Sequence, residues 1–197
     1  MPIRTIVDHG HITIEDPPFV HALFNTTTFA WIFVFIRGWL GWQWVEASMH
    51  KIGDPKWVAT GEALKGYWTK AVTIPAGGKS VIAFDWYRSF IQFMLDTGSY
   101  TWFAKLVAYG ELLIGIGLII GAFVGIAAFF GAFMNLNFIM AGSASSNGLL
   151  FALAVILILA WKVAGYYGVD FYLLRILGVP WKMGPSRRPQ PVSVAAD

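Results

Sequence analysis

The stretch IRGWLGWQWVEASMHK, residues 36–51, has the composition of a membrane helix but carries four titratable side chains. Tryptophan, glycine and aliphatic residues dominate it, as they do in transmembrane segments. Among them stand Arg37, Glu46, His50 and Lys51. A charge inside a bilayer is costly, so such residues usually face the interior of a helix bundle and have a partner there. The stretch therefore predicts a membrane helix with a polar inner face.

The composition of the whole chain is that of an integral membrane protein. Of its 197 residues 57% are hydrophobic and only 13% are charged, whereas soluble domains carry about 25% charged residues. The length allows about four spans of roughly 20 residues and one sizeable loop. The net charge of +3 does not indicate a nucleic acid partner, because basic residues in a membrane protein mainly concern topology and lipid headgroups.

The chain has no cysteine. This excludes disulfides, thiolate metal sites, iron–sulfur ligation and haem attached through a C-x-x-C-H motif. Glu46 and His50 lack a third ligand in the sequence pattern, so no metal site is predicted either. Any redox chemistry would therefore use a bound small molecule or a partner subunit.

Hydropathy and break signals divide the chain into an N-terminal segment, a membrane domain and a tail. The predicted fold class is an all-α integral membrane protein, a four-transmembrane-helix bundle with a helical extramembrane loop between helices 1 and 2. The N-terminal segment is predicted at 1–27, the membrane domain at 28–177 and the basic C-terminal tail at 178–197. The spans are predicted at 28–50, 100–120, 122–142 and 148–167, and the loop forms a cap at 52–99.

The cap is predicted to contain two amphipathic helices. The first, TGEALKGYWTKAV, has Thr60 as a possible N-cap. The second, at 83–96, repeats apolar residues at the spacing of one helix face, at Phe84, Tyr87, Ile91 and Met94. This spacing is typical of a helix that either lies at the membrane interface or caps the bundle.

Both termini are predicted to be cytoplasmic. Four spans return the chain to the side on which it started, and basic residues follow the fourth span closely, as is typical of cytoplasmic segments.

Arg37 and Glu111 are predicted to form a buried ion pair, because each lies roughly 14–15 Å from the cytoplasmic end of its span at about 1.5 Å per residue. Asn135 reaches the same layer from the third span. The three residues share their helix faces with small or bundle-facing residues: Gly41, Trp44, Ser48 and Lys51; Ala104, Ala108 and Gly115; Ala128 and Ala132. This set either only fixes the helix register or also lines a substrate or quinone pocket.

Two further groups are candidates for chemistry. Glu46 and His50, one turn apart and roughly opposite Arg37, either hydrogen-bond to each other or relay protons to a quinone. Lys51 and Lys105 fall near the loop-side membrane boundary. They either extend toward the interface, as lysines at helix ends do, or form with Arg37 an electropositive entrance for an anion.

The sequence resembles the DoxX/DoxD-like membrane protein family over about residues 29–177. The likeness lies in R-x-x-x-G…S-x-x-K in the first span, in ELLIGIGLIIG, and most specifically in NLNFIMAGSASSN…LLFALAVILILAWKVAGYYGVDFYLL. It implies a four-helix bundle in the cytoplasmic membrane of a prokaryote. Relatives include the large subunit of thiosulfate:quinone oxidoreductase, which passes electrons from thiosulfate to quinone and yields tetrathionate. The recurrent polar positions of the family match Arg37, Lys51, Glu111 and Asn135.

The favoured hypothesis is a membrane redox enzyme or subunit, in which a sulfur oxyanion approaches from the loop side and quinone enters between helices. Trp39, Trp42 or Trp44 would pack against the quinone ring. The candidate catalytic residues are Arg37, Glu111, Glu46 and His50, and the candidate binding residues are Arg37, Trp44, Lys51, Lys105 and Asn135.

The alternative hypothesis is a non-catalytic integral subunit that anchors or stabilises a respiratory or redox complex. A small transporter or channel is a third class, since intramembrane charges also mark ion paths. The expected partners are membrane lipid, quinone, and either other subunits or further copies of the chain.

Overall fold

The computed structural model describes residues 5–8, 11–14 and 16–179. Its first element is a hairpin of two short antiparallel strands, β1 (Thr5–Asp8) and β2 (His11–Ile14). The predicted N-terminal segment did not include this hairpin. Every later element in the described part of the chain is a helix, beginning with α1 (Pro18–Asn25) and a 3-10 turn (Thr27–Phe29), so the all-α prediction holds from that point on.

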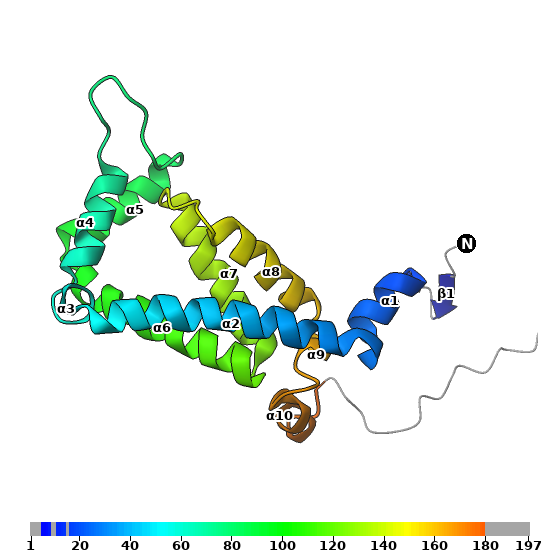
Figure 1. Ribbon diagram of the computed structural model, residues 1–197. Coiled ribbons are helices and arrows are strands. Elements are labelled where there is room, and N and C mark those ends of the chain that lie inside the picture. Colours follow the sequence, from blue (N-terminus) through cyan, green and yellow to red (C-terminus); the bar gives the residue numbers. More distant parts are fainter. Residues whose placement is uncertain (1–4, 9–10, 15, 180–197) are drawn as a thin grey trace, which may run out of the picture.

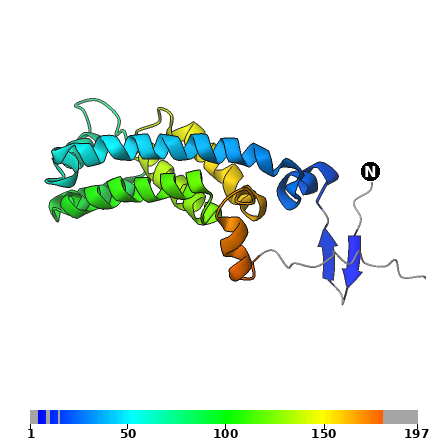
Figure 2. The ribbon, with the colours of Figure 1, turned by 60° about the horizontal axis from the view of Figure 1, so that its bottom comes forward.

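Four long helices form the body of the molecule. They are α2 (Ala30–Gly53), α6 (Tyr100–Ile120), α7 (Val124–Met140) and α8 (Asn147–Leu159). Figure 1 and Figure 2 show α2 and α6 side by side, with α7 and α8 as a second pair that crosses them. The helices agree with the predicted spans to within about one turn, except that the fourth breaks at Ala160 and resumes as α9 (Trp161–Ala164).

The backbones of α2 and α6 meet at Gly41 and Gly115. A Cβ atom on Gly41 would lie 2.8 Å from the carbonyl oxygen of Gly115, and one on Gly115 would lie 2.7 Å from Val45 Cγ2. Neither position has room for a side chain. This contact sets the antiparallel register of the two helices, as small residues do where membrane helices cross closely.

A cap of three helices covers one end of the body (Figure 1). It consists of α3 (Pro55–Val58), α4 (Glu62–Val72) and α5 (Asp85–Asp96). α2 ends at Gly53, as the Gly53-Asp54-Pro55 break predicts.

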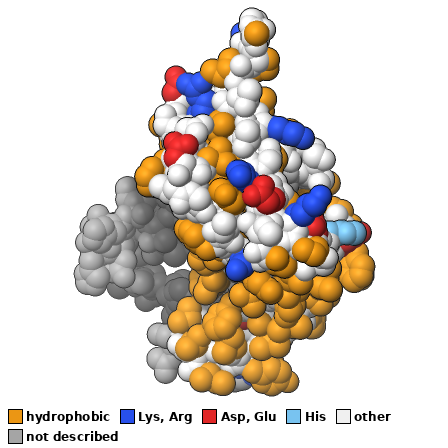
Figure 3. All heavy atoms as spheres, turned by 90° about the vertical axis from the view of Figure 1, so that its left-hand side faces the viewer, with side chains coloured by type: hydrophobic (Ala, Val, Ile, Leu, Met, Phe, Trp, Pro, Cys, Tyr) orange, Lys and Arg blue, Asp and Glu red, His pale blue; other side chains and the backbone are white. Residues whose placement is uncertain are grey.

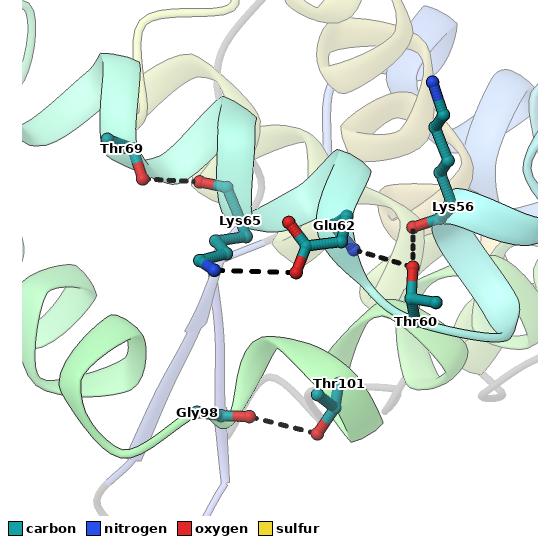
Figure 4. A network of polar contacts seen from close by, with 7 residues as sticks. All are labelled: Lys56, Thr60, Glu62, Lys65, Thr69, Gly98 and Thr101. Atoms are coloured by element: carbon teal, nitrogen blue, oxygen red, sulfur yellow. Dashed lines mark hydrogen bonds and ion pairs between the residues drawn. The ribbon is translucent and has the colours of Figure 1, made fainter.

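The start of α4 differs slightly from the prediction. Gly61 occupies the N-cap position with φ +75°, a left-handed conformation that suits glycine. Thr60, the predicted N-cap, still contributes, because its Oγ1 accepts a 3.3 Å hydrogen bond from the N–H of Glu62. Figure 4 shows this contact beside the Lys65–Glu62 ion pair of 3.5 Å.

The sequence left open whether α5 lies at the membrane interface or caps the bundle, and its contacts favour the second interpretation. Tyr87, Ile91 and Met94 are buried in a cluster with α4 and the ends of α6 and α7, whereas Phe84 is exposed. Two tyrosines tie the cap to α7. Tyr87 donates to the backbone and side-chain oxygens of Asn137, both at 3.1 Å, and burial raises the pKa of Tyr87 to about 12.

The second tie comes from α4. Tyr67 Oη donates to the carbonyl oxygens of Phe138 and Ala141 at 3.4 and 3.3 Å. The two phenols therefore add side-chain donors to carbonyl groups at the C-terminal end of α7, where those of Asn137 and Phe138 also accept from the N–H groups of Ala141 and Ser143.

The outer faces of the body are apolar. α6 is long and apolar enough to cross a membrane on its own. Segments Pro18–Asn25 and Thr27–Gly53 meet these criteria only together, with a 67° bend between them, and α7 and α8 are apolar but shorter. Figure 3 shows Lys, Arg, Asp and Glu side chains gathered over the upper part of one face, around the cap, and hydrophobic side chains over the lower part.

After α9 the chain packs against the α6–α7 connection, and the last described helix is α10 (Asp170–Ile176). The N–H groups of Val169 and Asp170 donate to the carbonyl oxygens of Ile120 and Gly121 at 3.1 and 2.8 Å. Most of the predicted basic tail, from residue 180 on, lies outside the described residues.

Candidate functional site

The predicted inner faces of the helices are buried. On α2 the stripe of Arg37, Gly41, Trp44 and Ser48 is buried and Lys51 is half-buried. The same holds for the predicted stripes of α6 and α7, which consist of Ala104, Ala108, Glu111, Gly115, Ala128, Ala132 and Asn135. The helical periodicity of the sequence thus predicted correctly which faces of α2, α6 and α7 are buried with their polar residues.

The predicted Arg37–Glu111 ion pair is wrong, because Glu111 binds Lys51 instead. Lys51 Nζ lies 2.9 Å from Oε1 and 2.7 Å from Oε2 of Glu111. The Glu111 side chain is 1% exposed and that of Lys51 is 19% exposed, so the lysine opens toward the outside at the cap end while the carboxylate is fully enclosed.

Two features explain this exchange of partners. First, α2 extends beyond α6, so Arg37 lies level with Leu118 and Ile119 near the end of α6, and Glu111 is about 11 Å further along. Second, helical side chains lean toward the N-terminus of their own helix. In antiparallel helices Arg37 and Glu111 therefore lean apart, whereas Lys51 and Glu111 lean toward each other.

Arg37 forms the centre of a separate cluster at the opposite end of α2, which we call the arginine clamp. Its Nη1 donates to the carbonyl oxygens of Leu118 and Ile119 at 2.8 and 2.6 Å, and Nη2 donates to that of Tyr167 at 2.7 Å. Only Nε lacks a hydrogen bond. The guanidinium thus satisfies carbonyl groups at the C-terminal end of α6, a position that also favours positive charge.

Asp170 completes the arginine clamp, and the sequence analysis missed it. Its carboxylate accepts from the N–H groups of Phe123 and Val124 at 2.6 and 2.9 Å, and so caps the start of α7. Burial raises the pKa of Asp170, while these two hydrogen bonds and the charge of Arg37 oppose the rise. A signal was present, because Asp170 is an acidic residue placed between the apolar stretch 148–167 and another apolar run.

Asn135 and Trp44 carry buried polar atoms without a partner. Asn135 is 0% exposed, and neither Oδ1 nor Nδ2 has a hydrogen bond within the described structure. The indole Nε1 of Trp44, on α2, is also buried and unpaired. Each such group costs about 1–3 kcal/mol when left unsatisfied. Among the described residues, Arg37 Nε, Ser80 Oγ and Arg175 Nε are the other buried side-chain atoms without a hydrogen bond.

Trp44 and Asn135 lie in neighbouring helix turns of the bundle interior. A Cβ on Gly131 would lie 3.3 Å from Trp44 Nε1 and 3.4 Å from Ile114 Cγ2, so α2, α6 and α7 meet there. Glu111 and Asn135 both lie about one turn from this meeting point toward the cap. We call Trp44, Lys51, Glu111 and Asn135 the inner polar layer.

Four other candidate residues do not join this layer. Glu46 and His50 are exposed on the outer face of α2, and the described structure contains no hydrogen bond or ion pair between them. Trp39 and Trp42 are exposed on the same face. Of the three tryptophans considered for a quinone ring, only Trp44 faces inward.

The three cations of the proposed anion entrance are separated. Lys105 is exposed on the outside of α6, and Lys51 is bound to Glu111. Arg37 lies fourteen residues before Lys51, which is about 21 Å along α2. These cations therefore form no common electropositive site.

Within residues 16–179 no group of three His, Asp or Glu side chains is placed to hold a metal ion. No family model matches the sequence, and no curated protein or solved structure matches it.

Proposed function

We propose that this chain is a multi-pass membrane redox protein of the DoxX/DoxD type, in which the inner polar layer binds a quinone. α2, α6, α7 and the α8–α9 segment would each cross the bilayer. The proposal combines the sequence resemblance with two properties of the described residues: the apolar outer faces and the unpaired polar atoms inside.

The helix lengths and outer faces support the membrane part of the proposal. α2 and α6, with 24 and 21 residues, are about 36 and 31 Å long, against a hydrocarbon core of about 30 Å. Large apolar side chains stand exposed on the outside of every long helix, including Leu113, Ile126, Phe130 and Leu149. A soluble monomer rarely exposes so much contiguous apolar surface.

The unpaired atoms of Trp44 and Asn135 carry the proposal for the ligand. A quinone carbonyl would accept hydrogen bonds from Trp44 Nε1 or Asn135 Nδ2, and a quinol hydroxyl would donate to Asn135 Oδ1. An amide offers both functions, so the same side chain serves both oxidation states. The layer is electrically neutral overall, because Lys51 and Glu111 compensate each other, and this favours a neutral ligand over an anion.

Lys51 and Glu111 would supply protons. Reduction of a quinone to a quinol takes up two electrons and two protons. When thiosulfate is the donor, two thiosulfate ions form one S–S bond, give tetrathionate and release the two electrons. Lys51 is partly exposed and hydrogen-bonded to Glu111, so the pair connects the exterior at the cap end with the buried layer.

The test is quinone binding and reduction by the purified full chain in lipid nanodiscs. A short-chain quinone analogue should bind, and thiosulfate should reduce it. Asn135→Leu should weaken quinone binding about tenfold, the equivalent of roughly 1.4 kcal/mol. Lys105→Gln, on the outer face, is the matched control and should bind normally. The proposal fails if no quinone analogue binds, or if Asn135→Leu binds it as well as the unaltered chain does.

A non-catalytic integral subunit is the second candidate function. The observation in its favour is that Lys51 binds both carboxylate oxygens of the buried Glu111 within the chain, so the pair can act solely in holding α2 to α6. In that case a stoichiometric partner should co-purify from membranes in mild detergent, and quinone analogues should not bind. Isolation of the chain without a partner would contradict this function.

A further inference from the structure

The outer face of α2 carries a regular row of large side chains that no described part of the chain covers. The row consists of Phe35, Trp39, Trp42, Glu46 and Met49, with steps of four, three, four and three residues. Such a heptad spacing aligns residues along one seam of a helix that pairs with another helix. We call this row, together with His50, the outer seam; its apolar members are all exposed, Phe35 to 71%.

Because it contains the charged residue Glu46, the outer seam is unsuited to contact only lipid. Glu46 lies seven residues before the end of α2, which is about 10 Å along the helix. Because α2 is only slightly longer than the hydrocarbon core, this position lies within the membrane in the proposed architecture. A charged side chain deep in a bilayer costs up to about 3 kcal/mol on insertion scales and normally has a partner. Within the described structure Glu46 has no hydrogen bond or ion pair.

The outer seam is complementary to itself. Two copies in one membrane share the same orientation, so a two-fold axis along the membrane normal places their α2 helices parallel. His50 leans toward the preceding turn of its own helix, as helical side chains do, and so approaches the level of Glu46. A two-fold axis through the seam brings the two Glu46 side chains toward each other. The His50 side chains flank them, so each Glu46 would bind the partner's His50, which offsets the repulsion between the carboxylates, and the contact occurs twice.

We propose that the outer seam is the contact surface of a homodimer, held by Glu46 of each copy and the partner's His50. Trp39 and Trp42 would pack across the axis on the side of the seam away from the cap. This inference rests on the proposed membrane architecture but needs neither quinone nor thiosulfate. The inner polar layer faces the opposite side of α2, so one layer would remain in each copy.

Cysteine cross-linking tests the contact directly, because the chain has no cysteine of its own. In Met49→Cys, mild oxidation of the full chain in native membranes should give a disulfide-linked dimer. Leu106→Cys is the matched control. Both positions are 56% exposed, and they lie at similar depth, since Ser48 of α2 bonds Ala108 of α6. Leu106→Cys should give little dimer.

A charge exchange tests the polar contact. Glu46→His places imidazoles opposite each other and should weaken dimerisation in nanodiscs or detergent about tenfold, as expected for the loss of the two symmetric intramembrane polar contacts. Glu46→His combined with His50→Glu recreates the pair in reverse and should restore the dimer. Native mass spectrometry of these variants gives the oligomeric state.

The outcomes separate this inference from the proposed function. If alkaline carbonate washes the chain off membranes, the membrane architecture and the homodimer both fail. If the chain stays in the membrane and Met49→Cys cross-links no better than Leu106→Cys, or links to a different protein, only the homodimer is overturned. Cross-linking specific to Met49→Cys, together with a dimer that is restored by the charge exchange, supports the homodimer, whether or not quinone binds.

Discussion

The arginine clamp and the inner polar layer both involve α2, α6 and α7, and the clamp also includes Tyr167 and Asp170. They differ in how completely their polar atoms are paired. In the clamp both Nη atoms of Arg37 bind carbonyl oxygens, and Asp170 caps α7. In the inner polar layer Lys51 and Glu111 are paired, but Trp44 Nε1 and the amide of Asn135 are not. Arg37 Nε is the one polar atom of the guanidinium without a hydrogen bond, whereas in the layer an indole N–H and a whole amide group are unpaired. We therefore expect the clamp to be mainly structural, and the binding role proposed above for the layer can be tested against it.

The strongest test of this contrast is Arg37→Met. Removal of the guanidinium leaves Asp170 buried without its counter-charge and three carbonyl oxygens without donors, so the free energy of unfolding should fall by about 3–5 kcal/mol. Thermal unfolding in detergent measures this loss. Arg37→Lys keeps the charge but not the forked set of donors, so its free energy of unfolding should lie between those of Arg37→Met and the unaltered chain. An unchanged melting temperature in Arg37→Met would contradict a structural clamp.

The Lys51–Glu111 pair should respond to single and double substitution in opposite ways. Lys51→Met leaves the enclosed Glu111 carboxylate without a partner and should destabilise the protein by about 3 kcal/mol. Adding Glu111→Leu removes the unpaired charge and should restore most of the stability, while the quinone reduction expected from the proposed function should stay lost. If the double variant is as unstable as the single one, the pair contributes more than mutual charge compensation.

The titration of Tyr87 tests how the cap is attached to α7, because its phenol is hydrogen-bonded to Asn137. Its folded-state pKa of about 12 exceeds the ordinary value of 10.0, so the unfolded chain releases the phenolic proton first. The contribution of Tyr87 to stability is therefore complete below about pH 10 and is lost as the pH rises toward 12, by roughly 2 kcal/mol. The difference in absorbance at 295 nm between the unaltered chain and Tyr87→Phe measures this titration. A transition near pH 10 would show that the Asn137 contacts do not enclose the phenol.

Asn135→Leu should have the smallest effect on stability and the most informative one. Without ligand, the variant should be as stable as the unaltered chain or about 1 kcal/mol more stable, because two unpaired polar atoms are replaced by an apolar side chain. A quinone analogue should raise the melting temperature of the unaltered chain only. Destabilisation of the ligand-free variant by several kcal/mol would show that Asn135 has structural partners, and the contrast with the clamp would disappear.

Several features of α2, α6 and α7 could be predicted from the sequence. The end of α2 before Pro55, the bounds of α6 and the burial of Arg37, Glu111 and Asn135 all follow from local signals, namely break residues, hydropathy and helical periodicity. The pairing of these residues does not follow, because it depends on the offset between helices. Because α2 extends a few residues beyond α6, Glu111 lies within reach of Lys51 and out of reach of Arg37.

The sequence by itself determined that this is a helical, largely apolar chain with a small set of polar residues turned inward, since a helix period and a hydropathy are properties of consecutive residues. Only the tertiary structure decided which of them are partners. The Gly41–Gly115 contact sets how far the antiparallel helices slide past each other, and the direction in which each side chain leans then brings some charges together and moves others apart. Asp170, remote in sequence from Arg37, entered the clamp only because the chain folds back onto the α6–α7 turn.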